Sequence, residues 1–579
     1  MSCRMSLDFT FRKAGGYSAC AREGLEAQEE LTASATRSAL AVEIGRGFPD
    51  NREEGGGEVA AIDYSMSEAV RAAYERGQDE ERMEPLARVD AAGCPVGRIA
   101  RGDAVVFCDI RGEREVELTA ALVDPAFSAF PVERLNLRFA TMIEYDPHLP
   151  VRVAFPPLER LGGTLAEAVS RAGLGQSRVA ESEKAIHVSY FFSGKRHEPF
   201  PGERRIVLRS PSEPLDAPHM RAAEVADAVE AELADPSPAL VVANLANIDV
   251  VGHSENRAAI ERAVAAVDAA VGRMVRAARQ SGVVAVITAD HGTVERWLYP
   301  DGSIDTGHTD SPVPFVLVPP CRESAHRLRE GGSLADVGPT LLELLGLEKP
   351  PEMTGRSLLA SSSGRETGRV LLVICDGWGE APPSPGNLIA ATPTPVMDEL
   401  RAAFPHTLLA AAGKAVGLPP GTVGNSEAGH LHLGAGRIVP ADRVRIDAAI
   451  EDGSFFENAA LRWAAEAARA GGRPLHVLGI VSFFSSHGSL DHLLALLELA
   501  RRAGVPEVFV HALLGRRGER PQSGAHYLRL VEERAAELGL GRVVSVIGRY
   551  WALDREQHWE RVQRAYDLLV RGIGKPVRG

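Results

Sequence analysis

Short apolar runs rich in β-branched residues alternate along this chain with longer amphipathic stretches, and this alternation constrains the fold most. Runs such as "VVAVIT" and "VLLVIC" are far shorter than a membrane helix and fit buried strands. The alanine- and valine-rich stretch that follows Asn256 repeats its apolar residues at helical spacing. The alternation therefore predicts an α/β protein whose parallel strands are joined by helices.

The strand-like runs fall into two groups, which predicts two α/β domains. The chain of 579 residues is also too long for a single core. Residues 1–60 show no steady periodicity, and we expect a poorly ordered extension there. One group of strands covers residues 238–246, 282–290, 312–318 and 369–376, and the other covers residues 103–110, 474–482, 505–514 and 542–548.

Charge and cysteine content limit the class of protein. The formal net charge of -14 argues against a nucleic-acid partner, because a phosphate backbone requires a basic face. A local cluster of arginines can still bind a small anion. The six cysteines form no CxxC pair, and residues 1–30 lack the apolar core of a signal peptide. We expect a monomeric cytoplasmic protein without nucleic-acid or membrane partners.

The strands of the first group end in acidic and imidazole residues. Ligands bind at the carboxyl ends of strands in open α/β sheets. A single aspartate there is more often a helix cap, so the prediction rests on the joint occurrence of six residues. Mixed carboxylate and imidazole ligands suit Mn²⁺ or Zn²⁺ better than Mg²⁺. The six candidate metal ligands are Asp249, His253, Asp290, His291, His308 and Asp376.

The stretch "GTVGNSEAGHLHLGAG" contains one serine, Ser426, which we expect as an exposed hydroxyl on a glycine-loosened turn. Six ligands are enough for two cations if this serine bridges to them. Metal coordination lowers the pKa of a hydroxyl, and the same ions neutralise charge on a phosphoryl group. The residues therefore predict a two-metal phosphoryl-transfer site around Ser426.

Five motifs resemble those of the cofactor-independent (2,3-bisphosphoglycerate-independent) phosphoglycerate mutases, which belong to the alkaline-phosphatase superfamily. The resemblance extends over about residues 65–575. It implies two Mn²⁺ or related divalent cations, no 2,3-bisphosphoglycerate, and interconversion of 3-phosphoglycerate and 2-phosphoglycerate through phosphorylated Ser426. The motifs are "VICDGWG", "GNSEAGH", "NIDVVGH", "TADHG" and "GHTDSPVPF". By this resemblance one metal is bound by Asp249, His253 and His308, and the other by Asp376, Ser426, Asp290 and His291.

Cationic residues follow the strands of the second group. The planar guanidinium fork binds carboxylate and phosphate groups, although a lone arginine is more often part of a surface ion pair. The family resemblance favours a substrate-binding role for particular cationic residues, and it implies that His487 is an acid/base residue. The implied substrate-binding residues are Arg111, Arg114, Lys184, Arg517, Arg549 and Arg555.

The order of the motifs departs from the family, in which the strand with the D-G-W-G motif opens the chain. This order predicts a circular permutation in which the termini of the usual family order are joined near 357–369. It also predicts that residues 66–70 lie close to residues 570–579. An artefact of cloning or sequence assembly is the alternative. The expected domains are an extension (1–60), a transferase domain (61–148 and 441–579) and a phosphatase-like metal-binding domain (149–440), with hinges near 144–155 and 442–453.

A second departure concerns the transferase half. Gly518 stands where the family has an aspartate that handles the glycerate hydroxyls, and the loop at 483–489 is altered. Two alternatives to a mutase follow, namely a metal-dependent phosphomonoesterase and a non-catalytic phospho-ligand-binding homologue with a decayed transferase half. Release of inorganic phosphate would favour the first, and binding without turnover would favour the second.

Overall fold

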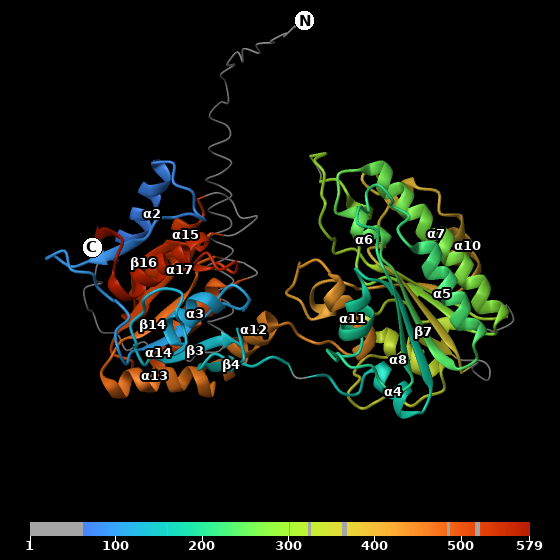
Figure 1. Ribbon diagram of the computed structural model, residues 1–579, viewed down its shortest axis with the longest axis horizontal. Coiled ribbons are helices and arrows are strands. Elements are labelled where there is room, and N and C mark those ends of the chain that lie inside the picture. The colour runs from blue at the N-terminus through green and yellow to red at the C-terminus, as the bar shows by residue number, and fades with distance from the viewer. Residues whose placement is uncertain are drawn as a thin grey trace, which may run out of the picture.

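The computed structural model contains two lobes, each built on its own sheet and its own apolar core (Figure 1). This arrangement confirms the prediction of two α/β domains. Within the described ranges, no helix is both long and apolar enough to cross a lipid bilayer. The expectations for residues 1–60, Arg517 and Gly518 fall outside the described residues. The structure describes residues 62–158, 160–299, 301–321, 326–361, 368–482, 487–515 and 522–579.

The first lobe is built on an eight-stranded sheet formed by both ends of the chain. Strands β16, β15, β14, β2, β3 and β4 lie side by side in this order, and each runs parallel to its neighbours in this series. Strand β1 pairs antiparallel with β16 and parallel with β17. The strand order is β17 (Lys575–Arg578), β1 (Leu86–Val89), β16 (Arg542–Gly548), β15 (Val508–Leu514), β14 (Leu475–Ile480), β2 (Ala104–Phe107), β3 (Arg138–Ile143) and β4 (Arg152–Phe155). Its helices are α2 (Ser65–Glu75), α3 (Val116–Val123), α12 (Asp442–Asp452), α13 (Ala459–Gly471), α14 (Leu490–Arg502), α15 (Gly524–Leu538), α16 (Arg549–Ala552) and α17 (Trp559–Tyr566).

The second lobe is built on a seven-stranded sheet. Strands β6, β5, β7, β12 and β8 run parallel to one another, but β9 and β13 pair antiparallel at one edge. The strand at 312–318, which the sequence grouped with the parallel βαβ units, is therefore antiparallel to its neighbours. The described residues between β8 and β9 contain only a single helical turn, at 294–296, and a parallel return requires a longer crossover. The order is β13 (His406–Leu409), β9 (Val313–Val318), β8 (Val284–Thr288), β12 (Val370–Cys375), β7 (Pro238–Leu245), β5 (Gly175–Glu181) and β6 (Glu203–Leu208). A separate two-stranded sheet pairs β10 (Arg327–Leu328) with β11 (Leu359–Ser361).

Helices cover both faces of this seven-stranded sheet (Figure 1). The long helix α7 begins after Asn256, whose side chain accepts a hydrogen bond from the backbone N–H of Ala259. Its alanine and valine stripe packs against the strands, and all six residues of β12 are buried, as expected for a central strand. One face carries α5 (Ala222–Ala234), α7 (Arg257–Gln280) and α10 (Pro395–Ala403), and the other carries α4 (Leu165–Arg171), α8 (Val337–Leu344) and α11 (Ser426–Ala435). Shorter elements are α6 (Asn247–Gly252), α9 (Leu388–Ala391) and the π-helical turn η1 (His187–Phe191).

Two segments, 156–164 and 436–441, connect the lobes (Figure 1). Strand β4 pairs with β3, so the first crossing follows Phe155 and not the expected boundary at 148. The apolar side chains of Leu158 and Leu161 pack against Val439 and α11, which places the two connectors in contact. Arg437 donates a hydrogen bond from Nη2 to the Gly162 carbonyl oxygen across the same contact (2.9 Å).

The two ends of the described chain meet in the first lobe. Helix α2 packs against β17, and β17 extends the sheet beside β1. The prediction that residues 66–70 and 570–579 lie close together is therefore confirmed.

Candidate metal centre and phosphoryl-transfer site

Three neighbouring strands of the second lobe bring three aspartates together. Strands β7, β12 and β8 are adjacent and parallel, so their carboxyl ends share one edge of the sheet. Asp376 follows β12 directly, Asp290 follows β8, and Asp249 lies on α6 just after β7. All three are at most 6% exposed, so this edge holds a buried concentration of negative charge.

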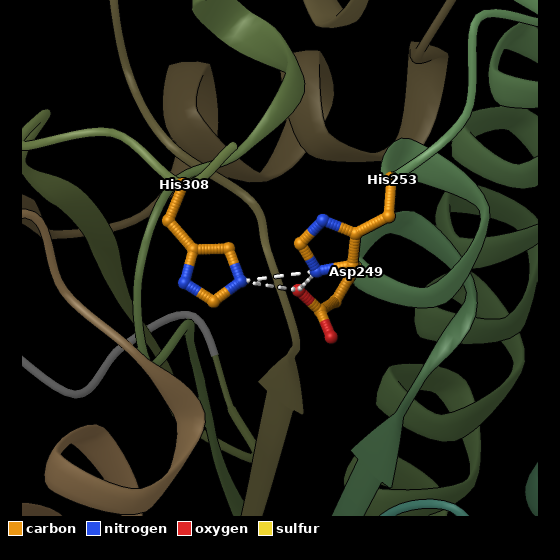
Figure 2. A group of neighbouring side chains, drawn as sticks. All are labelled: Asp249, His253 and His308. Carbon is orange, nitrogen blue, oxygen red and sulfur yellow. Dashed lines mark hydrogen bonds and ion pairs between the residues drawn. The ribbon is translucent and has the colours of Figure 1, made fainter. Parts of the chain in front are cut away.

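Asp249, His253 and His308 form one group of potential ligands (Figure 2). The Nε2 atoms of the two histidines lie 3.1 Å apart, and Asp249 Oδ1 lies 3.3 Å from Nε2 of His253 and 3.1 Å from Nε2 of His308. Each Nδ1–H can donate to a backbone carbonyl, at Thr306 for His253 and at Gly424 for His308, which leaves both Nε2 lone pairs facing the same point. His308 reaches this edge because β9 runs antiparallel and begins here.

A second group surrounds Asp290 and Asp376 and includes two residues that the sequence analysis missed. His430 Nδ1 lies 3.3 Å from Asp290 Oδ2, and Asn244 Nδ2 donates to Asp376 Oδ2 (2.7 Å). His291 Nε2 lies 3.6 Å from Asp376 Oδ1. His430 stands one helical turn after Ser426 in the same motif, and Asn244 is near the end of β7, so spacing could have indicated both.

Ser426 is the first residue of α11 and is 7% exposed, which corrects the expectation of an exposed hydroxyl. Its Oγ lies 3.0 Å from His291 Nε2 and 3.4 Å from Asp376 Oδ1. The glycines of the motif allow close packing instead of loosening a turn, because a Cβ on Gly429 would lie 2.6 Å from the Asp290 carbonyl oxygen. The helix N-terminus also favours negative charge at the serine oxygen.

Lys184 enters this cluster from the turn between β5 and η1. Its Nζ donates to Asp249 Oδ2, Asp376 Oδ1 and Ser426 Oγ, each at 2.7 Å. Burial alone would lower the pKa of this ammonium, but the carboxylates, Asp376 first, raise it. The structure thus places Lys184 beside the nucleophile and not with the arginines, where the sequence analysis had grouped it.

The donor set fits divalent cations. Asp249 Oδ1 and Asp290 Oδ2 are buried, yet within the described ranges neither has a hydrogen-bond partner. Burial, followed by repulsion from Asp290, raises the pKa of Asp376, so its ionised form is destabilised here. A bound cation would remove this destabilisation. Carboxylate oxygens, imidazole nitrogens and a hydroxyl are suitable ligands for Mn²⁺ or Zn²⁺, so the residues present fit such ions.

Four of the arginines predicted for substrate binding, Arg111, Arg114, Arg549 and Arg555, lie in the first lobe, at the carboxyl ends of β2 and β16. Arg111 Nε and Arg555 Nη1 contact Glu113 Oε1 at 2.9 and 2.8 Å. Arg114 donates from Nη1 to the Leu553 carbonyl oxygen at 3.1 Å. These contacts join segments from both halves of the chain at one edge of the sheet.

His487 is almost fully buried at the same edge. Its Nδ1 lies 3.1 Å from Glu115 Oε1, and Arg549 Nη2 donates toward its Nε2 at 3.3 Å. A guanidinium can only donate, so Nε2 is the acceptor and the imidazole proton is on Nδ1, facing Glu115. The buried carboxyl of Asp109 completes this cluster, and burial followed by repulsion from Glu115 raises its pKa well above the ordinary value. The sequence analysis missed Glu115 and Asp109, although both lie within the segment that carries Arg111.

Comparisons with known proteins match both lobes. The model described as Metalloenzyme superfamily matches residues 39–349, and the model described as BPG-independent PGAM N-terminus (iPGM_N) matches residues 446–578. The chain is 45% identical over 308 residues to a 2,3-bisphosphoglycerate-independent phosphoglycerate mutase of Thermomicrobium roseum, covering 52% of this chain and 58% of the relative. It is 40% identical over 357 residues to that of Pseudomonas aeruginosa, covering 58% of this chain and 68% of the relative.

A crystal structure of phosphoglycerate mutase from Leishmania mexicana at low cobalt concentration is 28% identical, with a TM-score of 0.35, and covers 48% of this chain and 53% of that one. The chain spans 58% and 57% of the first two curated relatives that it matches. The metalloenzyme match alone covers more than half of the chain, and the Pseudomonas relative is matched over more than two thirds of its length. The chain therefore belongs to the metalloenzyme superfamily and, within it, to the 2,3-bisphosphoglycerate-independent phosphoglycerate mutases.

Proposed function

We propose that this protein interconverts 3-phosphoglycerate and 2-phosphoglycerate through a phosphoserine at Ser426. The observation that carries the proposal is the position of Ser426 Oγ, which lies at a helix N-terminus within 2.7 Å of Lys184 Nζ and 3.0 Å of His291 Nε2. Such surroundings favour an alkoxide and a transferring phosphoryl group. The family relationship supports the same substrate.

In the first half of the reaction, Ser426 Oγ attacks the substrate phosphorus. Oγ loses its proton as the Oγ–phosphorus bond forms, and the bond from phosphorus to the C3 oxygen breaks. The C3 oxygen of the departing glycerate gains one proton, which balances the proton lost from the serine hydroxyl. Lys184 faces the serine oxygen from the side of Asp249 and Asp376, and donates to the negative charge that develops there.

In the second half, the C2 hydroxyl of glycerate attacks the phosphoserine. Its proton must be removed, and the serine oxygen must be protonated as it leaves. We assign the proton transfer to His487, whose neutral form is oriented by Glu115 and Arg549. The arginines bind the carboxylate and phosphate while glycerate turns. Since the two sets of residues lie on different lobes, transfer requires the lobes to approach one another.

The proposed metal content is two divalent cations, Mn²⁺ in the first instance, with no requirement for 2,3-bisphosphoglycerate. Asp249, His253 and His308 would hold one ion, and Asp376, Ser426, Asp290 and His291 would hold the other. When bound, such ions lower the pKa of the serine hydroxyl and neutralise charge on the phosphoryl group.

A coupled assay with 3-phosphoglycerate tests the proposal, and we expect formation of the 2-isomer that depends on Mn²⁺ and is lost in EDTA. Ser426→Ala should abolish both turnover and incorporation of phosphate into the protein, because the alanine has no oxygen to phosphorylate. Ser454→Ala, an exposed serine in the other lobe, is the matched control and should leave turnover unchanged. Isomerisation by Ser426→Ala would refute the assignment, and inorganic phosphate released faster than isomer would select a phosphomonoesterase.

The same proposal includes a monomeric cytoplasmic protein without nucleic-acid or membrane partners, and a circularly permuted chain. Two observations support the permutation. The model for the family's N-terminal part matches the end of this chain, at 446–578. In addition, α2 and β17 pack together as consecutive segments would. We place the lobe boundaries at 156–164 and 436–441.

A further inference from the structure

A cavity of about 240 Å³ lies in the second lobe, between the π-helical turn η1 and the strands β5 and β6 at the edge of the sheet. It is separate from the metal cluster, although its inner wall begins at Ala185, directly after Lys184. Aliphatic side chains form much of the lining. The residues that matter here are Arg178, Arg205, Ser189, Tyr190, Ile206 and Val207.

Two arginines lie side by side in the wall of this cavity. Arg178 on β5 and Arg205 on β6 are directly paired in the sheet register. Like charges at neighbouring strand positions repel, most strongly where water is excluded, and Arg178 is only 1% exposed. Glu203 accepts a hydrogen bond from Arg205 Nε at 2.6 Å, whereas Arg178 donates to neutral acceptors. Among the described residues, the two guanidinium groups and this carboxylate give the wall a formal charge of +1.

The two guanidinium groups also retain donors that are not used. Arg178 donates to the Ser177 carbonyl oxygen and to Gln176 Oε1, and its guanidinium lies 4.9 Å from the ring of Phe192. Its Nε, like Nη2 of Arg205, is buried and has no hydrogen-bond partner among the described residues. A buried donor left without an acceptor destabilises the folded protein, and an acceptor supplied by a ligand would relieve this. Burial also lowers the pKa of Arg178 to about 10.

We propose that this cavity binds a small organic monocarboxylate with an apolar body. A single carboxylate matches the formal charge of +1, and its two oxygens can accept from Arg178 Nε and Arg205 Nη2. The aliphatic lining suits the rest of such a molecule. Phosphoglycerate is a poor match, because it is more highly charged and has no apolar part. The inference is therefore independent of the proposed function.

Calorimetric titration of the Mn²⁺-loaded protein with benzoate tests this site, with benzamide as the uncharged analogue. Val207 lines the cavity and is 53% exposed, so Val207→Glu brings a carboxylate to the arginines without disturbing the core. We expect saturable binding of benzoate but not of benzamide. Benzoate affinity should fall roughly tenfold or more in Val207→Glu, because like charges repel. The matched variant Val207→Gln, which has the same shape without the charge, should bind benzoate within about twofold of the native protein.

The experiment should be repeated with 3-phosphoglycerate present at saturation, so that the substrate site is filled. Benzoate binding that persists under these conditions supports a separate site. The proposal is overturned if benzoate gives no saturable heat, if it is displaced by 3-phosphoglycerate, or if the Val207→Glu and Val207→Gln variants bind it equally.

Discussion

Lys184 illustrates how a single residue changes its expected role once its contacts are known. A lysine near an anionic substrate indicates a substrate-binding residue, yet Nζ lies 2.7 Å from two carboxylate oxygens and from Ser426 Oγ. It offsets part of the charge of three buried aspartates and donates to the nucleophile. Its contribution to the proposed reaction therefore belongs to the serine half and not to the arginine face.

Glu115 is a positioning residue for His487, and Glu115→Gln should expose this role. The substitution keeps the shape but removes the charge that stabilises an imidazolium next to Oε1. We expect kcat to fall about tenfold to a hundredfold with a smaller change in KM.

Glu117→Gln is the matched control, since Glu117 lies on the same helix but accepts a hydrogen bond from Gln557 N. It should leave kcat and KM close to the native values. Glu115→Asp, which keeps the charge, should recover part of the lost kcat. A Glu115→Gln variant with native kcat, or a Glu115→Asp variant that recovers none of the lost kcat, would contradict the positioning role.

At the scale of elements, a hydrogen-bonded relay crosses four neighbouring strands of the first sheet. Asp103, just before β2, lies 3.2 Å from His476 Nε2 on β14, and His476 Nδ1 lies 2.9 Å from His511 Nε2 on β15. His511 Nδ1 in turn lies 2.7 Å from Ser545 Oγ on β16. Burial and His476 hold the pKa of His511 well below its ordinary value.

This relay predicts a loss of stability in mild acid. In the unfolded chain His511 titrates near its ordinary pKa, so below about pH 6.5 the unfolded state binds one more proton than the folded state. The free energy of unfolding should therefore fall by up to about 1.4 kcal/mol per pH unit as the pH decreases. Urea denaturation at pH 5, 6 and 7 measures the slope, which should be shallower in His511→Gln. His526→Gln, at an exposed histidine, should keep the native slope, and equal slopes for both variants would contradict the prediction.

The packing of α11 against η1 sets the position of Ser426 and gives a second prediction. A Cβ on Gly434 would lie 1.8 Å from the Phe192 carbonyl oxygen, so Gly434→Ala must push the helix and the turn apart. We expect a loss of about 1–3 kcal/mol in unfolding free energy together with reduced turnover. Gly471→Ala at the end of α13 is the control, because its Cβ would meet nothing closer than 3.6 Å. Equal thermal midpoints for the two variants would refute this account of the glycine.

The elements that the sequence predicts well are those whose pattern is local. Strand β12 and helix α7 follow directly from a continuous apolar run and a helical stripe, and Asp376 and Asp249 follow from their strand ends. Residues that depend on pairing between distant segments were not predictable in this way. Glu115 meets His487 only because β2 pairs with β14, and the antiparallel β9 results from the absence of a crossover helix among the described residues before it. Ser426 was placed on the wrong kind of turn, because glycine-rich sequence indicates flexibility as readily as close packing.

At the scale of the whole molecule, the first lobe is assembled from the two ends of the chain. Strands β1 to β4 come from one end and β14 to β17 from the other, and they form a single sheet. Met66 N and Ser67 N donate to Glu532 Oε1, and Arg88 pairs with Asp63 beside the last residue. The ends are thus held by the same contacts that would hold two consecutive segments. The first lobe therefore requires contact between these two segments, and it does not depend on where along the chain the N- and C-termini lie.

A reordered chain therefore tests the proposed permutation. It begins at residue 368, continues to 579, passes through a short glycine–serine linker to residue 62 and ends at 361. A Cβ on Gly579 would lie 3.2 Å from Asp63 Oδ2, so the linker spans little distance and its closure costs little entropy. We expect native turnover and a native thermal midpoint. A control with the same linker but opened within α7, between Ala269 and Ala270, should fail to fold, because its new ends interrupt a helix packed on the core. If the chain opened at 361–368 proved as unstable as this control, 362–367 would not be the junction of former termini.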